Sequence, residues 1–191
     1  DFTTVGGQTR NYIGAIDTTT GAVTDFNPNA NGKVAALEVG DNVLYVGGQF
    51  TNIGGQTRNY IGAIDTTTGT VTDFNPDADW IVQALEVGDN VLYVGGEFTN
   101  IGGLAREKLE AIDTTTGLVT GFNPSAEGAD VYSLLSYGNV LYVSGVLWSV
   151  GGAYVNYLAP IDITTSKILV KRPEQWSTWS GGSIIKNLNN A

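Results

Sequence analysis

Four aspartates stand at nearly equal intervals along the chain, and each begins a threonine-rich segment. They are separated by 48, 48 and 49 residues: Asp17, Asp65, Asp113 and Asp162. A carboxylate at such a position accepts hydrogen bonds from the backbone N–H groups of the turn that follows. We therefore interpret these aspartates as structural turn caps. Catalysis is disfavoured because it needs one unequal constellation of groups, which equal repeats do not supply.

A run of oxygen-bearing side chains in the segment DFNPDAD could hold calcium. These side chains occupy alternate positions: Asp73, Asn75, Asp77 and Asp79. Calcium takes roughly six to eight oxygen ligands, and the earlier segment DFNPNAN repeats the pattern with fewer charges. The glycine and bidentate glutamate of a calcium loop are missing at the required spacing, and Asn-Pro commonly begins a turn. We favour a plain connecting loop, keep calcium as the alternative, and expect no other cofactor.

Three arginines recur in register after a Gly-Gly pair: Arg10, Arg58 and Arg106. Three cations around one face would suit an anionic ligand. The favoured interpretation is a repeated contact with a carboxylate or carbonyl within or between repeats, because the guanidinium fork offers several donors. The fourth copy has Val155 at this position.

All four tryptophans interrupt the repeated pattern: Trp80, Trp148, Trp176 and Trp179. We place Trp80 in a connection between repeats, Trp148 in a loop within a repeat, and the other two in an insertion at residues 174–182. Aromatic residues outside a repeated pattern are where contacts to a ligand or partner would be built. One hypothesis is that they stack on a sugar or contact a protein. The favoured alternative is that they fill a gap where the propeller ring closes.

The elements that must position these residues come from an internal repeat. Residues 11–28 read NYIGAIDTTTGAVTDFNP, and residues 59–76 read NYIGAIDTTTGTVTDFNP. Short apolar runs and glycine-rich turns, repeated at a period in the forties, are typical of β-propeller blades. We expect one all-β domain over residues 1–191, with about four repeats at roughly 2–49, 50–97, 98–146 and 147–191.

Each repeat is expected to form a blade of four antiparallel strands. In the clearest copy these strands are predicted at residues 82–87, 91–98, 109–113 and 118–122, with a loop at 99–103. The run VLYV in the second strand is apolar on both faces, which suits a strand packed between neighbouring sheets. The last strand carries Thr and Asp in other copies, which is typical of an outer edge. No segment has the period of a helix.

The sequence begins within a repeat and ends just after a further first strand, marked by Ile185 and Leu188. The favoured interpretation is a part of a longer propeller, such as a ring of about seven or eight blades. One alternative is a closed four-bladed ring with one composite blade. Another is that two chains pair into an eight-bladed ring, which would bury the open edges.

The composition limits the classes of partner. The formal net charge is −10, and both cysteine and histidine are absent. An acidic surface repels nucleic-acid backbones and anionic membranes. Without histidine the chain lacks the commonest general base and transition-metal ligand. No apolar run approaches the roughly 18 residues of a transmembrane helix, so we expect neither nucleic-acid binding nor membrane insertion.

Residues 43–76, VLYVGGQFTNIGGQTRNYIGAIDTTTGTVTDFNP, resemble the delta-60-type β-propeller repeat family. The VGGxFTxIGG and AIDxxTGxV elements carry the resemblance, which covers most of residues 2–171. The last copy departs from the pattern at Trp148, Ser166 and Lys171. The family has no assigned function, and its repeats occur in bacterial secreted and surface proteins and in phage-associated proteins. The resemblance implies an extracellular, cell-surface or virion-associated location.

These observations predict a non-catalytic structural or binding propeller, displayed on a cell or particle surface, with protein partners or a larger assembly. Near-identical repeats and the lack of an asymmetric cluster of titratable groups favour it. The alternative is a glycan-binding propeller that stacks sugars on the tryptophans. A third hypothesis is a glycosidase fragment, because glycosidase chemistry can rest on two carboxylates alone.

Overall fold

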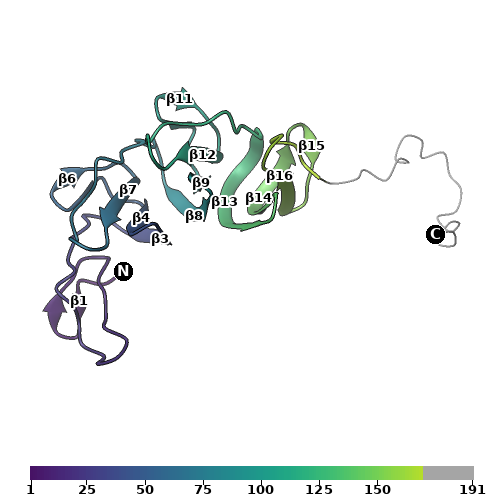
Figure 1. Cartoon of the computed structure of the whole chain (residues 1–191). Coiled ribbons are helices and arrows are strands. Elements are labelled where there is room, and N and C mark those ends of the chain that lie inside the picture. The colour runs from purple at the N-terminus through teal and green to yellow at the C-terminus, as the bar shows by residue number, and fades with distance from the viewer. Residues whose placement is uncertain (170–191) are drawn as a thin grey trace, which may run out of the picture.

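A computed structural model describes residues 1–169, and all regular structure in these residues is β. Small antiparallel sheets follow one another along an arc, from the hairpin near the N-terminus to the sheet at the opposite end (Figure 1). The prediction of an all-β fold is confirmed for these residues, which do not close into a barrel or ring. They contain no helix long and apolar enough to cross a membrane. The predicted insertion at 174–182, Ile185 and Leu188 lie outside them.

Two three-stranded sheets with the same strand order form the middle of the arc. The first sheet consists of β3 (Val34–Gly40), β4 (Val43–Gly48) and β7 (Ile61–Asp65). The second sheet consists of β8 (Val82–Gly88), β9 (Val91–Gly96) and β12 (Leu109–Asp113). In each sheet the middle strand in space is the second in sequence, as a hairpin followed by a returning strand requires. The sequence repeat therefore produces a repeat of whole sheets.

The third sheet has longer strands. It consists of β13 (Ala126–Tyr137), β14 (Val140–Val150), β15 (Ala153–Tyr154) and β16 (Leu158–Asp162). β13 and β14 form an extended hairpin whose register shifts between Glu127 and Ser133. Trp148 consequently lies in β14, so its prediction in a loop is wrong. The reason is that residues 126–128 continue β13 and give the end of β14 a pairing partner.

The loop predicted at residues 99–103 is instead the first half of a short hairpin. β10 (Asn100–Ile101) and β11 (Leu104–Ala105) pair across Gly102 and Gly103, which both have positive φ. Glycine adopts this conformation without steric cost, so a Gly-Gly pair makes a two-residue turn. The same hairpin recurs as β1 (Thr4–Val5) with β2 (Gln8–Thr9), and as β5 (Asn52–Ile53) with β6 (Gln56–Thr57).

The fourth strand predicted for each repeat is reduced to an isolated bridge. The bridged pairs are Ile16 with Val23, Ile64 with Val71, Ile112 with Val119, and Ile161 with Ile168. In the first sheet, the Thr72 hydroxyl accepts a hydrogen bond from the Phe74 N–H at 3.3 Å and donates to the Ala63 carbonyl at 3.3 Å. The Ala63 carbonyl also accepts a bond from the Thr72 N–H, whereas the Phe74 N–H, which a longer strand would pair, is taken by the side chain. The prediction of a full fourth strand, such as 118–122, is therefore wrong in its extent.

Apolar side chains fill the seams between successive sheets. At the first seam, Tyr45 and Ile61 of the first sheet pack with Leu85 and Leu92 of the second. The second seam is its counterpart one repeat later: Tyr93, Leu109, Leu134 and Leu141. In both seams the same face of one sheet meets the opposite face of the next, so the second sheet is covered on both sides. This packing holds the arc together.

Candidate functional site

The carboxylates of the four turn aspartates accept hydrogen bonds from the turns that they begin. Asp65 Oδ1 accepts hydrogen bonds from the backbone N–H groups of Thr67 and Thr68, at 2.9 and 2.8 Å. Asp17 and Asp113 make the same pair of bonds, and Asp162 accepts from Thr165. Hydrogen bonds from the threonines lower the pKa of each of these carboxyl groups. The geometry gives them a role in shaping the turns.

Two of the three repeated arginines are buried within their own repeats. Arg58 donates to the carbonyls of Thr57 and Thr72, at 2.8 and 2.7 Å, and to Gln56 Oε1 at 2.8 Å. Arg10 makes the equivalent bonds one repeat earlier. The stem of Arg58 also covers Gly62, where an added Cβ would lie 3.3 Å from Arg58 Cγ. These guanidinium groups bind their own sheet and do not face a common ligand site.

The third arginine has a different partner. Glu110 stands at the position that Gly62 holds in the first sheet. Arg106 forms an ion pair with Glu110. The Glu110 side chain is fully buried, and its Oε1 accepts a hydrogen bond from the Ala111 N–H at 2.8 Å. Burial raises the pKa of Glu110 to about 7, against the opposing effects of the Ala111 bond and of Arg106. The sequence analysis missed this group, although its departure from the repeat marks it.

Two of the three aspartates of the DFNPDAD segment, Asp77 and Asp79, make separate contacts, and Asp73 lines the first seam between sheets. Asp77 accepts a hydrogen bond from the Asn59 amide at 2.8 Å. Asp79 accepts four bonds from the backbone and side chains of Thr99 and Asn100. Partial burial acts to raise the pKa of Asp79, but these bonds outweigh it and hold the pKa well below its usual range. Within residues 1–169, no group of three or more Asp, Glu, His or Cys is placed to hold a metal ion.

Trp80 lies in a cluster of aromatic and polar side chains. The indole Nε1 donates to Glu97 Oε2 at 3.2 Å, and Gln83 Nε2 donates to Glu97 Oε1 at 2.6 Å. The Tyr60 ring lies beside the indole, with ring centroids 6.0 Å apart and ring planes inclined by 37°. The Trp80 side chain remains 52% exposed. We call Tyr60, Trp80, Gln83 and Glu97 the Trp80 site.

Three of the four residues of this site differ from the residues of the preceding repeat, and the fourth, Tyr60, repeats Tyr12. One repeat earlier, the positions of Trp80, Gln83 and Glu97 are occupied by Gly32, Ala35 and Gln49. At Gly32 a Cβ would lie 2.8 Å from the Gln49 carbonyl oxygen and 3.0 Å from Phe50 Cα, so the earlier connection has no room for a side chain. Among residues 1–169 this combination of side chains therefore occurs once, since the following repeat has Ala129, Tyr132 and Val146 at these positions. The sequence analysis singled out Trp80 and missed Gln83 and Glu97, although both also differ from the residues found one repeat earlier.

The third sheet contributes groups close to the Trp80 site. The Tyr132 hydroxyl donates to Asp130 Oδ2 at 2.7 Å, and Tyr132 is half-exposed. The bond to Asp130 raises the pKa of Tyr132, and the charge of Glu97 adds to the effect. Trp148 is 65% exposed on β14, a strand of the third sheet, whereas Trp80 precedes the second sheet. Trp176 and Trp179 lie outside the described residues.

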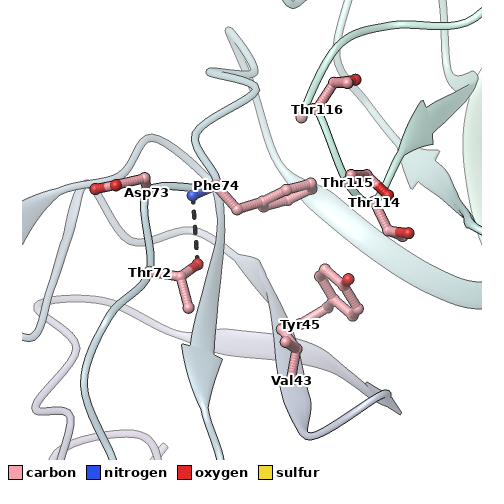
Figure 2. A pocket seen from close by; sticks show the side chains of 9 residues that line it. Val43, Tyr45, Thr72, Asp73, Phe74, Thr114, Thr115 and Thr116 are labelled. Atoms are coloured by element: carbon pink, nitrogen blue, oxygen red, sulfur yellow. Dashed lines mark hydrogen bonds between the residues drawn. The ribbon is translucent and has the colours of Figure 1, made fainter.

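Two cavities follow the seams between sheets. The first, of about 300 Å³, lies between Tyr45 and Phe74 of the first sheet and the turn at 114–117 of the second (Figure 2). The Tyr45 and Phe74 rings meet edge to face, with centroids 5.3 Å apart. The second cavity, of about 420 Å³, has Tyr93 and Phe122 at the equivalent positions. Because these cavities recur with the repeat, we assign them to seam packing and take the Trp80 site as the candidate functional site.

Comparison with known proteins gives a fold likeness only. No protein-family model matches the chain, and no curated protein matches it. The computationally designed protein Ika8 superposes with a TM-score of 0.56 and 16% identity, over 81% of this chain and 41% of Ika8. This chain thus spans about two fifths of the length of that protein. The designed protein Ika4 shares 17% identity over 67% of this chain and 94% of its own, and its TM-score of 0.34 is too low to carry an argument.

Proposed function

We propose that this chain is an arc of β-propeller blades that acts as a non-catalytic structural or binding module on the outside of a cell or particle. Each sheet would be one blade, and a further blade would continue the arc. The turn aspartates and the buried arginines support a structural role, because their side chains form hydrogen bonds within their own repeats. The membership of the repeats in the delta-60-type family stays a prediction.

The observation that carries this proposal is an apolar face of the third sheet that the described residues, 1–169, leave exposed. Leu158 of β16 is 55% exposed, whereas its repeat equivalents Ile61 and Leu109 are 0% and 1% exposed because the next sheet covers them. Tyr142 is 38% exposed, against 5% and 4% for Tyr45 and Tyr93. Leu135 pairs directly with Tyr142 and is also exposed. We call Leu135, Tyr142 and Leu158 the end face.

The opposite end of the arc presents the complementary side of a sheet. Ile16 and Leu37 are each more than half exposed, although their equivalents in later repeats are buried. Those buried equivalents are Ile64, Ile112, Ile161, Leu85 and Leu134. The two exposed surfaces are thus equivalent to the two surfaces that pack against each other in each of the two seams. Burying them would remove apolar area from water, so we propose that each binds a further blade of the same kind.

The solution mass of the chain at increasing concentration tests the proposal. We expect light scattering to report masses above the 20.1 kDa of one chain, and we expect Leu158→Glu to return the protein to a monomer. Leu118→Glu is the matched control, because Leu118 is equally an exposed leucine but lies in the turn after Gly117. A wild-type chain that stays monomeric at every concentration, with no response to Leu158→Glu, would contradict the proposal.

A further inference from the structure

The Trp80 site combines a fixed aromatic surface with mixed hydrogen-bonding groups. Its indole is anchored at Nε1 by Glu97 and flanked by Tyr60, while about half of the side chain faces solvent. An aromatic ring held in this way offers a large contact area with little conformational entropy left to lose on binding. A ligand with a flat apolar face and polar edges would use both parts of the site.

The polar groups beside the indole can both accept and donate hydrogen bonds. Each Glu97 carboxylate oxygen takes one donor from within the site, which leaves acceptor capacity on both oxygens. The Gln83 amide adds a carbonyl oxygen and a second N–H. The Tyr132 hydroxyl donates to Asp130 on β13, the strand that packs against β8, which carries Gln83. Sugar hydroxyls, which donate and accept at once, match this mixture.

We propose that Trp80, Gln83 and Glu97 form a binding subsite for an uncharged pyranose unit of an oligosaccharide. The C–H face of the sugar stacks on the exposed side of the Trp80 indole. Its hydroxyl groups donate to the Glu97 carboxylate and bond with the Gln83 amide. This proposal is independent of the end face, which involves other residues of the third sheet.

The charges around the site select against acidic sugars. Glu97 and Asp130 bring two acidic side chains to this region, and the whole chain has a formal net charge of −10. The Lys108 ammonium group donates to the Glu97 backbone carbonyl at 3.0 Å and is held there. A cationic ligand is the competing class, since cations are drawn to aromatic faces and carboxylates. The sugar is favoured because two neutral donors already engage the carboxylate.

Titration followed by the indole N–H signals in ¹⁵N NMR tests the subsite directly. The probes are cellobiose, maltose, lactose and N,N′-diacetylchitobiose, with choline as the cationic probe. We expect at least one disaccharide to shift the Trp80 indole signal saturably. Trp80→Ala removes this signal, so its affinity is compared with that of the wild type by titration calorimetry. It should weaken the binding by about tenfold or more, as the loss of a central aromatic contact does. Trp148→Phe is the matched control, and it should leave the affinity unchanged.

Two further variants test the polar half of the site and guard against misfolding. Gln83→Ala restores the residue found one repeat earlier, so it should fold and weaken binding several-fold. Leu158→Glu, which alters the end face, should bind the sugar as the wild type does. The proposal is overturned if no disaccharide gives a saturable shift, if binding survives Trp80→Ala unchanged, or if choline alone binds.

Discussion

Glu110→Gln tests whether a buried carboxyl group makes the stability of this fold depend on pH near neutrality. Glu110 lies fully buried in β12, with Arg106 and the Ala111 N–H as its partners. In the first sheet the same position is Gly62, so the fold itself needs no carboxyl group there. Glutamine has nearly the same shape and carries no charge. The substitution therefore removes the ionisation and leaves the packing of the strand.

The structure sets the sign and size of the effect. The pKa of Glu110 is about 7 in the folded chain, against 4.5 for an ordinary glutamate. Between these values the folded chain holds a proton that the unfolded chain has lost, so the free energy of unfolding falls as pH rises from about 4.5 to 7. At about 1.4 kcal/mol per pH unit, the shift corresponds to about 3 kcal/mol in total. The full contribution is present below pH 4.5.

Urea unfolding of the wild type and of Glu110→Gln at several pH values measures this term. The variant should become more stable relative to the wild type as pH rises from 4.5 to 7.5, by about 3 kcal/mol. Taking the difference removes the effect of Glu38, whose pKa is also raised by burial. A difference that stays flat over this range would refute the argument. It would mean that Arg106 keeps Glu110 ionised in the folded chain throughout.

Two further predictions concern packing and the connecting loops. Gly47→Ala should destabilise the chain by about 1–3 kcal/mol in urea unfolding, because the new Cβ would lie 2.6 Å from Val82 Cγ1 in the first seam. Gly121→Ala is its control, because a Cβ there meets no atom within 4 Å. Equal effects of the two substitutions would contradict the packing argument. Asp79→Ala should cost about 1 kcal/mol at neutral pH through its lost hydrogen bonds, whereas Asp79→Asn should cost less, since Asn31 accepts the equivalent backbone bonds one repeat earlier. Because the pKa of Asp79 is lowered, the excess stability of the wild type over Asp79→Asn should be lost as pH falls below about 4, and a constant excess down to pH 2 would contradict it.

Local patterns predicted the strands that the sheets share. The strand predicted at 109–113 coincides with β12, and the one at 82–87 is one residue shorter than β8. These segments owe their structure to apolar runs bounded by turn residues, which are visible in the sequence. The fourth strand was overestimated because the bond between the Thr72 hydroxyl and the Phe74 N–H competes with strand pairing. Such a bond depends on a side-chain rotamer, which the residue pattern does not reveal.

The candidate site could be predicted only in part, because its members are far apart in the sequence. Trp80 and Glu97 are separated by 17 residues and meet through the pairing of β8 with β9, in which Val82 lies opposite Gly96. A comparison of the repeats would have identified these positions as departures without showing that they touch. The register shift between Val82 and Ala84 sets which side chains meet, and it follows from backbone geometry that the sequence pattern leaves open.

Four of the departures from the repeat lie in the stretch that forms the second sheet, and this placement has a physical basis. Gly32, Ala35, Gln49 and Gly62 show which residues the same positions hold when they serve structure alone. Their replacements Trp80, Gln83, Glu97 and Glu110 add polar or bulky groups that each carry a cost. The second sheet is packed on both faces, and its seams bury equivalent apolar sets on either side. A sheet supported in this way can hold costly side chains in place, so specific recognition would be built on it rather than at the exposed ends of the arc.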